Sequence, residues 1–92
     1  MFTLHHARDG KHKYVAFFNI DGHTKRVPFG AFGYSDFTEH RDEDRKYRYL
    51  KRHYERENWN DPYTAGALSR WLLWNRPTLQ ESLREFKEYF DL

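Results

Sequence analysis

Residues Lys13–Phe29 read KYVAFFNIDGHTKRVPF, and this stretch decides the fold because two strand-forming runs flank one tight turn. The first run, Lys13–Ile20, is rich in β-branched and aromatic residues, which favour strands. Asp21-Gly22 follows it. An Asp-Gly pair between two such runs is the strongest short-range hairpin pattern, because the primed turn needs positive φ at both positions. The sequence therefore predicts an antiparallel hairpin here.

A third strand is predicted on the N-terminal side of this hairpin. Asp9-Gly10 offers a second turn, which leads back to the run FTLHHA at residues 2–7. The simplest arrangement of the three strands is an antiparallel meander. Because side chains alternate along a strand, one face of the middle strand is expected to carry Tyr14, Ala16, Phe18 and Ile20.

Three helices are predicted after a loop with two glycines at residues 29–38. The first spans about Asp42–Glu57, and the second, strongly apolar, spans Thr64–Asn75. The third begins at Thr78, where Glu81 stands at the position that a capping box requires. The predicted fold is therefore α+β: an N-terminal three-stranded antiparallel β-meander packed against three C-terminal helices, in a single domain of residues 1–92.

Three tryptophans lie in the predicted helical part of the chain. The element Trp-Asn-x-Pro begins at Trp59 and again at Trp74, and Trp71 lies between the two copies. Each copy stands where one predicted helix ends and the next begins, which suits Pro at a helix start. We expect Trp71 and Trp74 to be core rings and Trp59, in a polar stretch, to be exposed.

Composition excludes several classes of function. The 92 residues contain no Cys, so neither a disulfide framework nor a cysteine zinc site is possible. The six His have no metal-binding spacing, and we predict no metal or other cofactor. No run approaches the roughly 18 apolar residues of a membrane span, and the N-terminus lacks the apolar centre of a secretory signal. The expected protein is neither membrane-bound nor secreted.

A basic run gives the main functional hypothesis. Residues Arg45–Tyr54 contain five Lys or Arg and no acid, although the net charge of the whole chain is only +2. On a helix, arginines spaced i, i+3, i+7 and i+11 from Arg45 share one stripe, which suits contact with phosphates. The residues expected to contact nucleic acid are Arg45, Lys46, Arg48, Tyr49, Lys51, Arg52, His53 and Arg56. The alternative is a solvated helix whose charges the flanking acids balance.

Two other functions compete with nucleic-acid binding. Aromatic residues make up 20% of the chain, which suits a protein interface, and Tyr34, Trp59 and Tyr63 are candidate contacts if they are exposed. Metal-dependent phosphodiester cleavage has weaker support. The acids at positions 36, 39, 42 and 44 surround His40, but their spacing matches no nuclease motif. We therefore expect a non-enzymatic protein with no small-molecule substrate.

A resemblance adds to this interpretation. The chain carries YSD followed by T and H (34–40), RKxRYxxRH (Arg45–His53) and WxDPxTAGALSRWLLWxxPTL (Trp59–Leu79). This pattern resembles a family of short uncharacterised proteins encoded by large DNA viruses of algae and related giant viruses, with Arg76 where lysine is usual. The resemblance implies a viral binding module in the virion or in the host cytoplasm or nucleus. The implied partners are nucleic acid or, alternatively, other virion proteins, as for a minor capsid protein.

Overall fold

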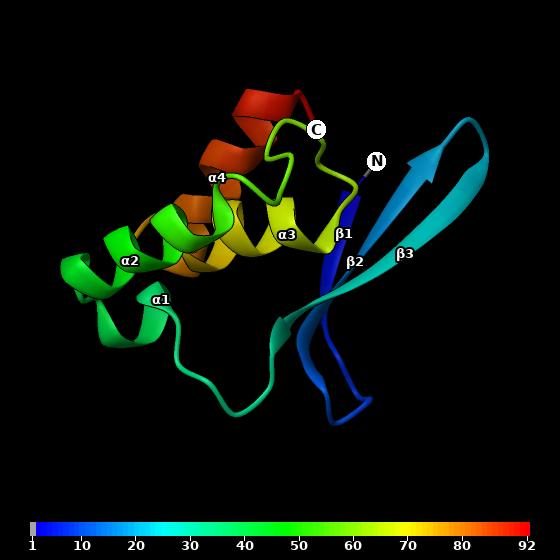
Figure 1. Ribbon diagram of the computed structural model, residues 1–92. Coiled ribbons are helices and arrows are strands. Elements are labelled where there is room, and N and C mark those ends of the chain that lie inside the picture. The colour runs from blue at the N-terminus through cyan, green and yellow to red at the C-terminus, as the bar shows by residue number, and fades with distance from the viewer. Residues whose placement is uncertain (1) are drawn as a thin grey trace.

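Figure 1 shows a computed structural model of the chain, which describes residues 2–92. The elements in chain order are β1 (Phe2–His6), β2 (His12–Ile20), β3 (His23–Ala31), α1 (Phe37–His40), α2 (Glu43–His53), α3 (Ala65–Leu68), η1 (Ser69–Leu73) and α4 (Leu79–Phe90). The three strands form one antiparallel sheet in the order β1-β2-β3, and helices follow. The predicted α+β fold with an N-terminal meander is confirmed.

Both predicted turns join neighbouring strands. In the β2–β3 hairpin, Ile20 pairs with His23, and the two residues between them, Asp21 and Gly22, have φ of 51° and 83°. Positive φ at both positions is the primed turn that matches the twist of the flanking strands. At the β1–β2 turn, the Asp9 carboxylate accepts the N–H groups of Lys11 and His12, both at 2.9 Å.

One face of the sheet and three helical elements form the core. Ala16 and Phe18 on β2 are 0% and 1% exposed, and they pack with Leu72 of η1 and Phe86 of α4. Burying a side chain such as Phe18 contributes roughly 1.5–3 kcal/mol. Tyr14 and Ile20 lie against the same cluster, as the alternation predicted. The apolar face of α4, with Leu79, Leu83, Phe86 and Phe90, also packs there.

The second predicted helix is not one regular helix. α3 changes after Leu68 into the π-helical turn η1, in which the N–H of Trp74 bonds to the carbonyl of Ser69 at 3.1 Å. The wider turn accommodates one extra residue, so Leu72 and Leu73 are both buried. The prediction of a helix to Asn75 was wrong, because the backbone leaves the helix at Trp74, where φ is −122°.

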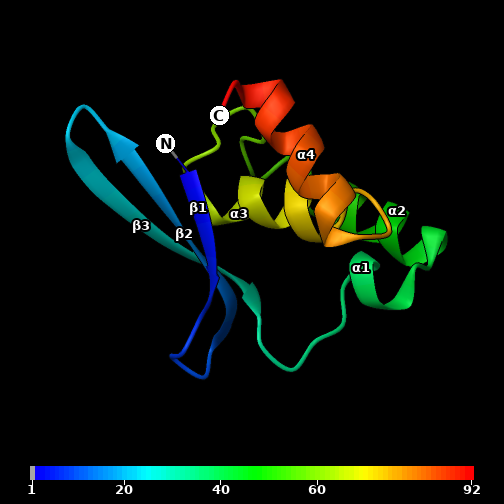
Figure 2. The ribbon, with the colours of Figure 1, turned by 180° about the vertical axis from the view of Figure 1, so that it is seen from behind.

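The helix boundaries near the basic run also differ from the prediction. A short helix, α1, occupies the end of the predicted loop; Asp36 caps it by accepting the N–H of Thr38 at 2.9 Å. α2 ends at His53 rather than Glu57, because the N–H of Arg56 bonds back to the His53 carbonyl in a tight turn. Figures 1 and 2 show α3 between α2 and the sheet, so α2 lies at the outer edge of the molecule.

Each of the three tryptophans is half-buried. Trp71 and Trp74 pack against the core cluster but are not buried within it, so the prediction of two core rings holds only in part. Trp59 is not the exposed ring that the sequence predicted: its indole N–H donates to the Glu57 carboxylate at 2.8 Å, and its carbonyl accepts the indole N–H of Trp71 at 2.8 Å. No helix within residues 2–92 has the length and apolar character needed to cross a membrane.

Gly30, at the end of β3, is predicted to be the least replaceable glycine of the sheet. Its φ is +79°, and an added Cβ would lie 2.8 Å from Cδ1 of the buried Leu73. Gly10 has a similar φ of +74° but nothing within 4 Å, which makes it the matched control. Gly10→Ala should cost about 1 kcal/mol of unfolding free energy from backbone strain alone. Gly30→Ala should cost about 1–3 kcal/mol more from overpacking.

Urea denaturation of the two variants and the wild type measures both costs. Equal destabilisation by Gly30→Ala and Gly10→Ala would mean that Leu73 moves aside freely and that β3 and η1 are not closely packed.

Candidate nucleic-acid interface

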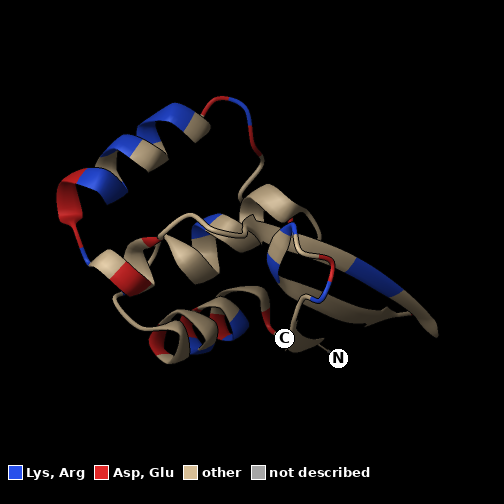
Figure 3. Cartoon of the chain, turned by 90° about the horizontal axis from the view of Figure 1, so that it is seen from below, with Lys and Arg blue, Asp and Glu red and all other residues tan. Residues whose placement is uncertain are grey.

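α2 carries the basic run, and its charges are sorted along the helix. Asp42 caps the start by accepting the N–H groups of Asp44 and Arg45 at 3.0 and 3.3 Å. Figure 3 shows the acids at this end and Lys and Arg along the remainder. Acids near the N-terminus and bases near the C-terminus both suit the helix dipole. Asp42 is therefore engaged as a cap, and Glu43 and Asp44 lie in the first turn ahead of the arginines.

A stack of rings attaches α2 to the rest of the protein. The Tyr49 ring lies 4.2 Å from that of Trp74 at an interplanar angle of 4°, and His53 covers the other face of Tyr49 at 4.1 Å. Burial raises the pKa of the Tyr49 hydroxyl well above its ordinary value of 10, and the Glu57 carboxylate adds to the shift. Both faces of Tyr49 are covered, so this predicted contact residue serves the packing of α2.

Lys46 also faces the protein rather than solvent. Its ammonium donates to the Asn75 carbonyl at 2.6 Å and lies 4.9 Å from the centre of the Phe37 ring. Burial lowers the pKa of Lys46. Lys46, Tyr49 and His53 therefore occupy the inner side of α2, and the arginines occupy a different side.

Three of the predicted arginines converge on one hollow. Arg45, Arg48 and Arg52 line a cavity of about 300 Å³ together with Tyr34, Ser35 and Trp74. All three arginines are exposed. Within residues 2–92, none of their guanidinium groups has a carboxylate within 4.0 Å. We call this set of three side chains the arginine row.

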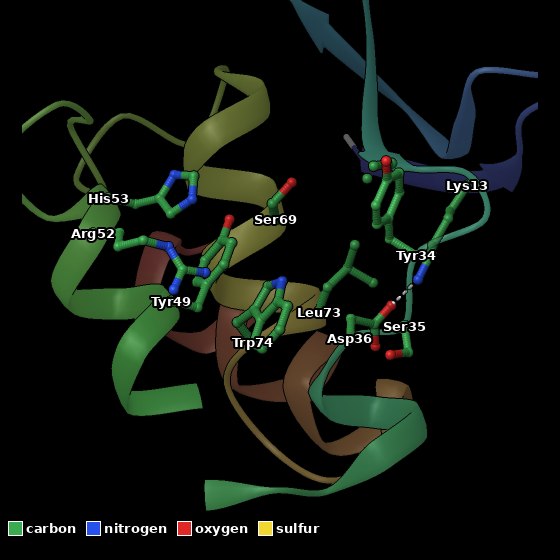
Figure 4. A pocket seen from close by; sticks show the side chains of 12 residues that line it. Lys13, Tyr34, Ser35, Asp36, Tyr49, Arg52, His53, Ser69, Leu73 and Trp74 are labelled. Atoms are coloured by element: carbon green, nitrogen blue, oxygen red, sulfur yellow. Dashed lines mark hydrogen bonds and ion pairs between the residues drawn. The ribbon is translucent and has the colours of Figure 1, made fainter. Parts of the chain in front are cut away.

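A second hollow of about 330 Å³ continues from the first and shares Tyr34, Ser35, Arg52 and Trp74 with it. In Figure 4, Arg52, Tyr49 and His53 project from α2 on one side, and Lys13, Tyr34, Ser35 and Asp36 lie on the other. Ser69, Leu73 and Trp74 lie between the two sides. We call the two hollows together the cleft.

The inner end of the cleft is charge-paired. The Lys13 ammonium donates to Asp36 and to Glu39, both at 2.6 Å. Burial lowers the pKa of Lys13, but these two hydrogen bonds outweigh it, so the pKa is raised overall. Two carboxylates face one ammonium there, whereas the arginine row at the outer end has no counter-charge in the described chain. The cleft is therefore positive at the α2 side and not at the Lys13 side.

The remaining predicted contact residues lie elsewhere. Lys51 is on the opposite side of α2, where it lines a hollow of about 400 Å³ with Tyr47, Leu50, Tyr54, Glu55 and Trp59. The prediction placed Arg56 on the same helical stripe as the other arginines. Because α2 ends at His53, Arg56 lies beyond the helix and does not continue that stripe. The single basic face of the prediction is thus reduced to the arginine row.

Of the three candidate protein contacts, only Tyr34 is free. Tyr34 is 74% exposed, whereas Trp59 and Tyr63 are half-buried. The ring of Tyr63 meets the Phe18 ring edge-on, with 4.8 Å between their centres, and packs against the core. Sequence reasoning did not single out Phe32, which is 64% exposed on the same loop as Tyr34. The pair of glycines around it, Gly30 and Gly33, was the available sign of an irregular loop.

The acidic run does not assemble into a metal site. Asp36 and Asp42 are the N-caps of α1 and α2, and the Asp36 carboxylate also accepts from Lys13. Among residues 2–92, no three His, Asp or Glu side chains gather in a way that would hold a metal ion.

Tyr49 makes the attachment of α2 sensitive to alkaline pH. Because its folded pKa is raised, the fold favours the protonated phenol, and that contribution is present below the unfolded pKa of 10 and is lost as pH rises further. The wild type should lose unfolding free energy above pH 10 more steeply than Tyr49→Phe, whose ring cannot ionise. Tyr47→Phe, at a 65% exposed position on the same helix, is the control and should behave as the wild type. Urea denaturation at a series of pH values checks this; identical slopes for all three proteins would contradict it.

Comparison with known proteins gives a family but no established activity. A family model described as "Family of unknown function (DUF5754)" matches residues 2–53, from β1 to the end of α2. The match includes Tyr34 and the arginine row, and it stops before Trp74. No curated protein matches the chain, and no solved structure matches it. Since the match covers more than half of the 92 residues, the chain belongs to the DUF5754 family.

Proposed function

We propose that this chain is a small non-enzymatic module that binds nucleic acid through the arginine row. The observation that carries the proposal is the convergence of Arg45, Arg48 and Arg52 on one hollow without a carboxylate partner in residues 2–92. Arginine binds phosphate through a planar, bidentate fork, and an unpaired guanidinium has no internal contact to break first.

The spacing of the row suits a nucleic-acid backbone. Arg45 and Arg52 are seven residues apart on α2, which corresponds to roughly 10 Å along the helix axis. Each guanidinium can pair with one phosphate, so the row can meet up to three phosphates of a nucleic-acid backbone. The polyanion is recognised by this local arrangement, since the net charge of +2 is too small to attract it. In keeping with the resemblance noted above, the proposed setting is viral nucleic acid or the virion.

A metal-dependent nuclease has less support than a binding module. The acids that such an enzyme would need at positions 36 and 42 accept the N–H groups at the starts of α1 and α2. If these carboxylates became metal ligands, the two helix caps would be lost, and each cap contributes about 1 kcal/mol to the stability of the fold.

Removal of the arginine row should weaken nucleic-acid binding specifically. The test variant is Arg45→Gln/Arg48→Gln/Arg52→Gln, and the matched control is Lys25→Gln/Arg26→Gln/Arg84→Gln, which removes three other exposed charges. Each lost phosphate contact should reduce the magnitude of the slope of log K against log salt by about 0.7–0.9. The slope of the test variant should therefore be smaller than that of the wild type by up to about 2–3. Fluorescence anisotropy of a labelled oligonucleotide at several salt concentrations measures the slope.

Circular dichroism verifies that both triple variants are folded. If the two triple variants lost the same affinity for the oligonucleotide, binding would depend only on the net charge of the protein and not on the arginine row. Absence of wild-type binding at low salt would end the proposal.

A second candidate function is structural assembly with further copies of the same chain, as in a minor capsid component. The observation in its favour is the outer face of α2, where Tyr47 and Tyr54 are 65% and 69% exposed beside the 400 Å³ hollow. α2 is acidic at its start and basic at its end. Two copies of α2 packed antiparallel would therefore place opposite charges side by side around these rings, in a self-complementary contact.

Sedimentation velocity over a concentration series tests this second candidate. The wild type should show a weight-average mass that rises with concentration, and Tyr47→Ser/Tyr54→Ser should remain monomeric. Phe32→Ser/Tyr34→Ser removes two equally exposed rings elsewhere and should associate as the wild type does. A wild type that stays monomeric throughout the series would exclude assembly through this face.

A further inference from the structure

We propose that the cleft takes a single strand of nucleic acid, with phosphates along the arginine row and a base lying on the ring of Tyr34. This inference rests on the proposed function and names the form of nucleic acid that the same site accepts.

The shape of the cleft favours a thin ligand. The arginine row forms a wall of a hollow, and Tyr34 and Ser35 of the β3–α1 loop form the wall opposite. A helix that reads duplex DNA enters the major groove with its contact side chains projecting outward and its flanks clear. On the arginine side of α2, one flank is closed by the loop. The loop wall therefore hinders the approach of a broad duplex more than it hinders a strand that can enter the cleft.

The size of the cleft suits a ligand of nucleotide dimensions. Its two connected parts have volumes of about 300 and 330 Å³. Pockets that enclose small organic ligands have volumes of roughly 300–1,000 Å³. The boundary between the two parts is shared by Arg52 and Trp74, so one nucleotide can contact both the positive wall and the inner hollow.

Tyr34 offers a ring face that no other ring covers. Most rings near the cleft are already stacked: Tyr49 lies between Trp74 and His53. In the described chain, neither Tyr34 nor Phe32 pairs with another ring, although 74% and 64% of these side chains are exposed. Exposed aromatic rings beside a cationic groove are the usual platform for unpaired bases, whose faces a duplex hides.

The charges of the cleft give the strand an orientation. At the inner end, Asp36 and Glu39 together outnumber the single ammonium of Lys13. A phosphate is repelled from that end and attracted to the arginine row. The base then points away from α2, toward the loop that carries Tyr34. The hydroxyl of Ser35 also lines the cleft and can hydrogen-bond to an exposed base edge.

The test compares four probes with the wild-type chain by fluorescence anisotropy. They are an oligothymidylate of about 12 nucleotides, within the usual site sizes of roughly 4–16; an oligouridylate of the same length; the duplex of the oligothymidylate with oligodeoxyadenylate; and an abasic deoxyribose-phosphate strand of equal length. At least one of the two single strands with bases should bind about tenfold more tightly than the duplex and than the abasic strand. The better of oligothymidylate and oligouridylate identifies DNA or RNA as the natural class.

Variants of Tyr34 assign the base contact. Tyr34→Ala should weaken binding of the preferred strand by about tenfold and leave the abasic strand unchanged, whereas Tyr34→Phe keeps the ring and should retain wild-type affinity. Tyr47→Ala removes an exposed ring on the opposite side of α2 and should have no effect. Because Tyr34 is exposed, these variants are expected to fold, which circular dichroism verifies.

The two proposals fail in different ways. If the wild type binds none of the probes at low salt, the proposed function is wrong and the inference falls with it. If the duplex or the abasic strand binds as tightly as the single strands, and the arginine-row variant still weakens binding, the proposed function stands and the single-strand inference is wrong. An equal effect of Tyr34→Ala on the abasic strand and on the strand with bases would also overturn the base contact.

Discussion

The arrangement of the site depends on the parallel stack of Tyr49 on Trp74. α2 contains no fully buried residue, and its α1 neighbour is only four residues long, so the core does not hold it as it holds α4. The stack, with His53 on the outer face of Tyr49, fixes which side of α2 faces the protein. Once that side is fixed, the three arginines, each of which directly precedes one of the inward residues, project beside the stack and over the cleft. Because Tyr49 lies on the same helix as the row, its nearly parallel contact with Trp74 fixes the direction of the row as well as its position.

The same geometry explains why the arginines are without partners. Acidic residues are as numerous near α2 as basic ones, but Asp42 is used as a cap and Glu57 is held between His53 and Trp59. Gly66 makes room for Glu57, since a Cβ there would lie 2.7 Å from its carboxylate carbon. Asp36 and Glu39 are committed to Lys13. These four carboxylates have local donors, and none of them lies within 4.0 Å of a guanidinium of the arginine row, so the positive charge remains at the surface.

The extent to which the sequence predicts this structure depends on how local each determinant is. Asp21-Gly22 and Thr78 with Glu81 act within four residues, and both the hairpin and the start of α4 follow the prediction. The end of α2 depends instead on contacts between Glu57 and residues on both sides of it, and the π-turn of η1 depends on how Leu72 and Leu73 fit the sheet. No short pattern encodes either of them.

The site was predicted as a helix but not as a cleft. Periodicity sorts the residues of α2 into stripes, but it does not tell which stripe faces the protein. The hydrophobicity of the side chains alone would predict that the stripe of Tyr47, Leu50 and Tyr54 faces the core, yet Tyr47 and Tyr54 are exposed. Lys46 and Tyr49 face the protein because they contact the Asn75 carbonyl and the Trp74 ring. Both partners are more than twenty residues away in the sequence. Such contacts belong to the tertiary structure and cannot be read from the sequence of α2 alone. For this reason, five of the eight predicted contact residues lie outside the arginine row.

The cleft also joins parts of the chain that are far apart in sequence. Residues 2–53, which the family model matches, supply the loop of Tyr34 and the arginine row, and these are its two walls. Between them lie Ser69 and Leu73 of η1 and Trp74 directly after it, all beyond the matched residues. The walls alone would not hold their separation, since α2 meets the first half of the chain mainly through the short α1. The C-terminal helices therefore do more than complete the core: through Trp74, which lies between the two walls, they also set the width of the cleft.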